Sequence, residues 1–135
     1  MNYKQLYILA VVVILFSSCT KRTPLKQYIH DAEKVEVMIY SGNAPQLQYA
    51  TNDQDKIQQW MNYISDSTAS AGNCSFEGQL TFVIGSDSLP MQFSMKKGCT
   101  IVHYTMNGKT FVQPLTDEGI KYIQSLEDRK QMFNN

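Results

Sequence analysis

The side chains best suited to covalent or metal chemistry in this 135-residue chain are Cys19, His30, Cys74, Cys99 and His103. Metal-binding motifs hold such residues at close spacings, as in C-x-x-C or H-E-x-x-H. Here the five side chains are scattered, and none of them belongs to such a motif. We therefore expect neither a metal site nor a cofactor. The cysteines need another explanation.

His103 lies in the stretch 99–106, whose residue types are typical of a β-strand. A catalytic base needs a nucleophile and an orienting acid within hydrogen-bonding reach. No motif supplies them, because Ser86 in Gly85-Ser86-Asp87 lacks the G-x-S-x-G pattern of hydrolases. We expect a non-enzymatic protein in which His103 is a packing residue of a strand. A small enzyme that uses His103 is an alternative.

The first eighteen residues have the pattern of a secretory signal. Lys4 is the only charged residue before position 21, and Leu6–Phe16 is an unbroken apolar run that Ser17 and Ser18 follow. Eleven helical residues span about 16 Å, roughly half of a hydrocarbon core. A basic start, a short apolar centre and small residues at the end predict export and cleavage.

The sequence Phe16-Ser17-Ser18-Cys19 resembles the lipobox of bacterial lipoproteins, in the form with an aromatic first residue found in Bacteroidota. The resemblance covers about the first twenty residues. It implies attachment of diacylglycerol to the Cys19 sulfur, cleavage before Cys19 and a lipidated N-terminus. Two or more acyl chains hold a protein stably on a membrane. Thr20-Lys21-Arg22 lacks the acidic residues associated with surface export, so we expect an outer-membrane protein that faces the periplasm.

Removal of residues 1–18 leaves Cys19 as the lipid attachment point and Cys74 and Cys99 as an even pair. Exported proteins meet an oxidising compartment, so this pair predicts a disulfide bond. In the chain-entropy model such a bond stabilises the fold by about 3–4 kcal/mol.

Hydrophobic periodicity predicts an α+β fold in the order β-β-α-β-β-β-β-α: an antiparallel sheet of about six strands, with two helices packed on one face. The expected strands cover 32–40, 47–50, 79–84, 89–95, 99–106 and 109–113, and the expected helices follow residues 53 and 116. The predicted organisation is a signal peptide at 1–18, a lipidated tether at 19–31, a single domain at 32–130 and a frayed C-terminus at 131–135.

Two turns predict the register of the hairpins. A four-residue loop at 85–88 would set Phe82 opposite Met91. Asn107-Gly108 is the strongest hairpin signal, because both central positions of a type I′ turn need a positive φ. That turn predicts Tyr104 opposite Phe111.

Charge argues against a nucleic-acid partner, since twelve basic residues balance twelve acidic ones. We expect an accessory or binding subunit, anchored in the membrane through Cys19, that docks onto another envelope protein. The alternative is an inhibitor or immunity protein that protects the envelope from a hydrolase or toxin, with 66–73 as its plug. The candidate binding residues lie on the sheet face opposite the helices: Thr81, Gln92, Ser94, His103, Thr105 and Thr110.

Overall fold

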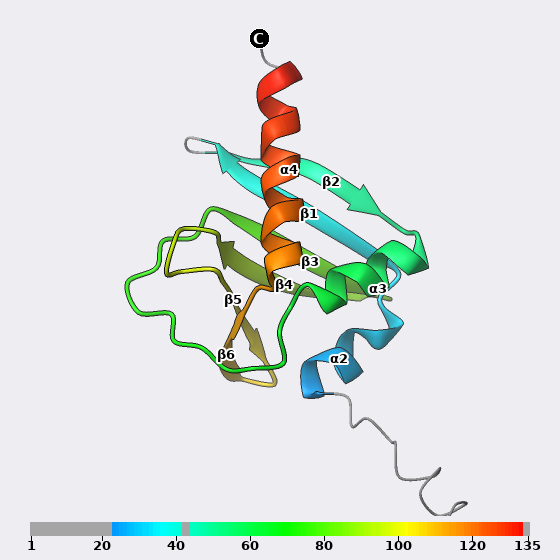
Figure 1. The fold of residues 1–135 in the computed structure, drawn as a ribbon. Coiled ribbons are helices and arrows are strands. Elements are labelled where there is room, and N and C mark those ends of the chain that lie inside the picture. Colours follow the sequence, from blue (N-terminus) through cyan, green and yellow to red (C-terminus); the bar gives the residue numbers. More distant parts are fainter. Residues whose placement is uncertain (1–22, 42–43, 134–135) are drawn as a thin grey trace, which may run out of the picture.

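The computed structural model describes residues 23–41 and 44–133, which form one antiparallel sheet with helices on one of its faces (Figure 1). The predicted signal peptide and Cys19 lie outside the described residues. The elements are α2 (Pro24–Tyr28), η1 (Ile29–Asp31), β1 (Lys34–Ser41), β2 (Ala44–Thr51), α3 (Gln54–Asn62), β3 (Gly78–Ile84), β4 (Asp87–Ser94), β5 (Ile101–Met106), β6 (Lys109–Pro114) and α4 (Asp117–Phe133).

The sheet has six strands in the order β2-β1-β3-β4-β5-β6, and every neighbouring pair is antiparallel. The sheet twists strongly, so that the β5–β6 hairpin points in a clearly different direction from β1 and β2 (Figure 1). The predicted α+β fold with a six-stranded antiparallel sheet is confirmed, and the elements follow one another along the chain roughly as predicted.

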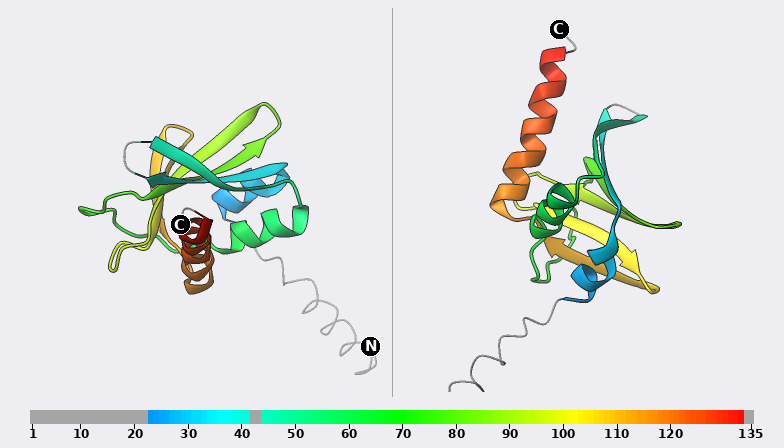
Figure 2. Two further views of the ribbon diagram at one scale, coloured as in Figure 1. Left: turned by 90° about the horizontal axis from the view of Figure 1, so that it is seen from above. Right: turned by 90° about the vertical axis from the view of Figure 1, so that its right-hand side faces the viewer.

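The core lies between the helices and one face of this sheet, which we call the covered face. Alternate residues of β1, β3 and β4 point into it, among them Val37, Leu80 and Met91, which pair across the three strands and are all buried. The view along the sheet edge shows α3 and α4 on one side of the strands (Figure 2).

Local sequence explains where the two longer helices begin. Asp53 caps α3, because its Oδ1 accepts hydrogen bonds from the backbone N–H groups of Asp55 (3.0 Å) and Lys56 (3.4 Å). Thr116 caps α4 in the same way, with Oγ1 3.2 Å from the N of Gly119. Both helices therefore begin where they were expected, after residues 53 and 116. The apolar residues of α3, Ile57, Trp60 and Met61, are buried.

The folded domain begins earlier than predicted. Residues 24–31 were expected to belong to a tether, but they form α2 and η1, and Ile29 is 0% exposed. Thr23 caps α2 and Pro24 occupies its first turn, which is a favourable helix start. Leu25 and Ile29 are four residues apart and therefore share a face, which packs into the core. At the other end, α4 continues to Phe133, past the predicted domain end at 130.

The predicted register of β3 and β4 is wrong by two residues. Phe82 pairs with Leu89 rather than Met91, because the loop contains only Gly85 and Ser86. Gly85 has a φ of 58°, as the first position of a tight hairpin turn requires. A shift of two residues keeps each side chain on its face, so the apolar face is still the covered one. The register of β5 and β6 is confirmed, with Asn107 and Gly108 at φ 53° and 73°.

Candidate binding surface

No helix formed by the described residues 23–41 and 44–133 lies on the second face of the sheet, and we call it the bare face (Figure 2). The strand register places one row of residues across it, from one edge of the sheet to the other. Directly paired residues of antiparallel strands point to the same face, so the pairings determine the row. Its members, from β2 to β6, are Leu47, Met38, Gln79, Gln92, His103 and Val112.

The row is partly open to solvent and contains no Asp, Glu, Lys or Arg. Leu47, on the edge strand β2, is 59% exposed, and the other five residues are half-buried. A pair of charges flanks the row in β1, where Lys34 Nζ lies 2.5 Å from Glu36 Oε1. Charged residues are depleted at the centre of protein interfaces and methionine is enriched there, which is the composition of this row.

A shallow hollow of about 280 Å³ lies in the middle of the bare face. Its walls include Gln79, Pro90, Gln92, His103 and Thr105, which come from three consecutive strands. The amide of Gln79 is oriented by a hydrogen bond from its Nε2 to Thr81 Oγ1 (3.1 Å). A hollow with amide, imidazole and hydroxyl groups on its rim can receive one side chain that carries a polar end.

All six predicted binding residues point to the bare face, but only four of them reach solvent. Thr105 and Thr110 are exposed, with their Oγ1 atoms 3.4 Å apart, and Gln92 and His103 are half-buried. Thr81 is 8% exposed, because it lies on the central strand β3 between two paired neighbours.

Ser94 is 0% exposed, and its Oγ has no hydrogen-bond partner in the part of the chain that the structure describes. Glu77 binds the backbone on both sides of it. The backbone N–H of Glu77 donates to Phe93 O (2.9 Å), and its Oε2 accepts from the N of Met95 (2.6 Å). Ser94 is therefore removed from the candidate contact residues.

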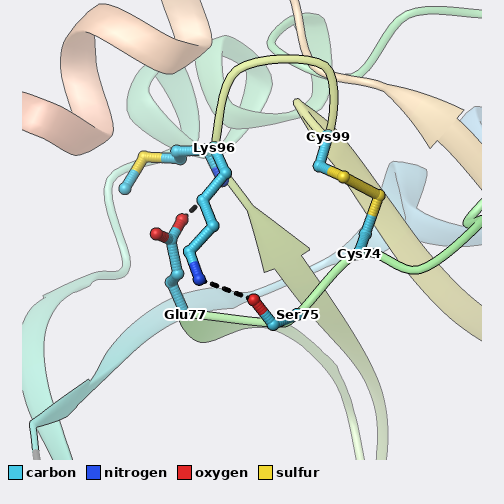
Figure 3. The surroundings of a disulfide bond; sticks show 6 residues. Cys74, Ser75, Glu77, Lys96 and Cys99 are labelled. Atoms are coloured by element: carbon cyan, nitrogen blue, oxygen red, sulfur yellow. Dashed lines mark hydrogen bonds between the residues drawn. A yellow bond between two sulfur atoms is a disulfide. The ribbon is translucent and has the colours of Figure 1, made fainter.

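The segment 74–77 lies against the β4–β5 part of the bare face. Three of its residues contact the segment 95–99 that follows β4 (Figure 3). Cys74 and Cys99 have disulfide-compatible geometry, with Cα atoms 5.6 Å apart. Lys96 Nζ donates to Ser75 Oγ at 2.7 Å. Phe76 packs its ring on the imidazole of His103, with centroids 5.4 Å apart. This segment therefore forms one wall of the binding surface.

His103 faces Gln92 on β4 and Val112 on β6, neither of which is a nucleophile or an acid. Within residues 23–41 and 44–133, no group of three His, Cys, Asp or Glu side chains is placed to hold a metal ion. The groups on this face can donate and accept hydrogen bonds and can pack against apolar atoms. They are suited to recognition.

The tyrosine next to His103 points the opposite way. Tyr104 lies on the covered face, is 3% exposed, and donates a hydrogen bond of 2.5 Å to Gln113 Oε1. Burial disfavours the phenolate and raises the pKa of Tyr104 to about 12. Burial also raises the pKa of Tyr63 and of Tyr122, which pack with Trp60 between α3 and α4. These hydroxyls stay neutral in ordinary conditions and belong to the core.

The predicted binding residues did not include four members of the row: Met38, Leu47, Gln79 and Val112. The sequence pattern could have identified Gln79, because the alternation of β3 places it on the same face as Thr81. The alternation of β1 likewise places Met38 on the face opposite Val37 and Ile39. Leu47 was not identifiable, because its pairing with Met38 follows a register shift between β1 and β2 that no residue pattern predicts.

Comparison of the chain with protein-family models, with curated protein sequences and with solved structures finds no match. No helix in the described part of the chain is both long and apolar enough to cross a bilayer.

Proposed function

We propose that this protein is a non-enzymatic lipoprotein of the cell envelope, anchored through Cys19, that binds another envelope protein with the bare face. The uncharged row across all six strands carries the proposal. Interfaces have few charges at their centre, and the residues that dominate binding energy fill pockets. The row supplies the first feature and the hollow beside His103 supplies the second.

Rigidity of the surface also supports recognition. Four of the six row residues belong to strands that pair with a neighbour on both sides. A fifth, Val112, belongs to β6, whose outer edge is bonded to segment 65–69. There Ser65 N donates to Pro114 O and Ala69 N donates to Val112 O, both at 2.9 Å. A surface that is already ordered loses little conformational freedom when it binds. The partner would meet a preformed face.

Site-specific photo-crosslinking in native membranes tests the proposal. A photoreactive amino acid at Thr105, on the bare face, is expected to capture one defined partner. The same residue at Gln58, exposed on α3, serves as the matched control and is expected to capture none. Capture of the same protein at both positions would show collision rather than docking, and no capture at Thr105 would contradict the proposal.

A second candidate function, inhibition of a hydrolase or toxin, is favoured by the loop at 66–73. Most of this loop is exposed, and it is fixed at both ends. The bond from Ser65 N to Pro114 O holds the start of the loop, and the pairing of Cys74 with Cys99 holds its end. Fixed, exposed loops suit insertion into an enzyme cleft, because their ordering cost is already met.

The two functions differ in which surface the partner contacts. Asp66→Ala together with Thr68→Ala changes exposed side chains of the loop and leaves the bare face intact. Loss of protection from one toxin with that variant, and retained capture at Thr105, would assign the function to the loop. Loss of the membrane complex with bare-face variants alone assigns it to the row.

A further inference from the structure

A second hollow, of about 380 Å³, lies at the β5–β6 end of the sheet, between α2 and segment 66–69. We call it the α2 cavity. Its volume falls in the range of about 300–1,000 Å³ that is usual for small-molecule sites. Its lining comes from Thr23 and the start of α2, from segment 66–69 and from the β5–β6 hairpin.

The walls of the α2 cavity are mainly apolar, with polar groups on the sheet wall and at the rim and with the hydroxyl groups of Thr68 and Thr110. On the sheet wall, Gln113 accepts from the Tyr104 hydroxyl through Oε1 and donates from Nε2 to Ser65 O (3.0 Å). At the rim, Asp66 accepts from Thr23 Oγ1 (3.2 Å) and lies 3.0 Å from Lys26 Nζ. Asp66 is the one charged side chain that the described part of the chain contributes to this lining, and it is already paired.

The α2 cavity is close in the sequence to the predicted lipid attachment point, Cys19. Thr23 and Pro24 line the cavity, and Cys19 lies four residues before Thr23. Four extended residues reach at most roughly 14 Å. If Cys19 is lipidated, as the proposed function requires, the cavity is held close to the membrane surface. The most abundant apolar molecules at that surface are acyl chains.

We propose that the α2 cavity binds one unbranched acyl chain. A dry enclosed cavity of about 150 Å³ takes one benzene molecule, so by proportion this partly open cavity has room for at most roughly fifteen carbon atoms. The apolar side chains of Leu25, Ala69, Met106 and Phe111 surround the chain. The free lone pair of the Tyr104 hydroxyl and the second amide proton of Gln113 are among the polar groups that the ligand meets inside.

Photolabelling of the full chain in phosphatidylcholine vesicles tests the proposal. The vesicles contain a small fraction of palmitic acid with a diazirine on its chain, and the adducts are located by mass spectrometry after irradiation. Adducts are expected on the β5–β6 hairpin, at 104–113. Ala69→Trp fills the cavity and is expected to lower their yield at least about tenfold, which corresponds to two lost buried methylenes. Ala50→Trp, on β2 and outside the cavity, is the matched control and is expected to change nothing.

Two further versions of the experiment identify the lipid from which the bound acyl chain comes. In one, the diazirine is on the phosphatidylcholine; in the other, cells are grown on the labelled fatty acid, so that the lipid of Cys19 carries it. Hairpin adducts that Ala69→Trp removes, in any arm, support the proposal and name the source. Phe111→Ala, which enlarges the cavity, is a second variant. With this variant and fatty acids longer than palmitic acid, the adducts are expected to shift to other residues of the hairpin.

Adducts restricted to residues 1–22 in all three arms would overturn the proposal, as would hairpin adducts that Ala69→Trp leaves unchanged. Failure of the anchor is distinguishable from failure of the cavity. A Cys19→Ala chain that leaves the membrane but is still labelled at 104–113 by free palmitic acid would remove the anchor and keep the acyl site.

Discussion

The covered face and the bare face are built from the same six strands, but different forces shape them. On the covered face, Val37, Leu80 and Met91 meet beneath the helices and are fully buried. Their chain neighbours Met38, Gln79 and Gln92 pair with one another on the bare face and are half-buried. Apolar burial is therefore concentrated on the covered face, and substitutions on the bare face are expected to change the surface with little effect on the core.

The largest expected effect separates the two faces within one strand. Phe93 is buried on the covered face and Gln92, its neighbour in β4, lies on the bare face. Phe93→Ala should lower the free energy of unfolding by about 3–5 kcal/mol, because it removes a buried ring and leaves a cavity. Gln92→Ala should change it by less than about 0.5 kcal/mol. Urea unfolding measures both, and equal losses would mean that the bare face is part of the core.

The Cys74–Cys99 pair offers a way to disturb the bare face without touching the core. Replacement of both cysteines by serine should lower the free energy of unfolding by about 3–4 kcal/mol, since the predicted bond closes a loop of 25 residues. The segment 74–77 should loosen, and the ring contact between Phe76 and His103 should weaken. Chemical denaturation and the NMR signals of His103 report the two effects. Mass spectrometry of the exported protein that finds two free thiols would contradict the predicted bond.

Alkaline pH tests the covered face alone. The pKa of Tyr104 is raised to about 12 in the folded protein, against an ordinary value near 10. A raised pKa means that the folded state holds its proton more tightly, so this stabilisation is complete below pH 10 and is lost as the pH rises through about 12. Unfolding experiments across this range should show a loss on the order of 2 kcal/mol that Tyr104→Phe removes. A Tyr104→Phe chain with an unchanged alkaline slope would contradict the assignment.

The elements of the fold were predictable because short-range signals determine them. Asn107-Gly108 fixed the β5–β6 register, and alternation in β1 and β3 identified the covered face. The β3–β4 register was missed because Gly85–Ser88 contains turn formers at every position, and the pattern of turn residues alone does not choose between a two- and a four-residue loop. The helix α2 was missed because five residues carry too little periodicity.

The binding surface was only partly predictable, for a different physical reason. Strand alternation shows which way Thr81 and Ser94 point, but their burial depends on neighbours that come from other parts of the chain. For Ser94 these include Glu77, whose position depends on the fold of the segment after Cys74. Side-chain direction is a local property, whereas accessibility depends on the whole fold.

We propose that the bare face, and no other surface of the described domain, binds a partner in the envelope. The most direct measurement is quantitative co-purification from native membranes with Gln92→Glu and with Gln58→Glu, two substitutions that change one amide to a carboxylate of the same shape. Gln92→Glu places a charge at the centre of the uncharged row and should abolish the complex, with unfolding unchanged within about 0.5 kcal/mol. Gln58→Glu, on exposed α3, should retain it. Equal recovery of the partner with both variants would contradict the account.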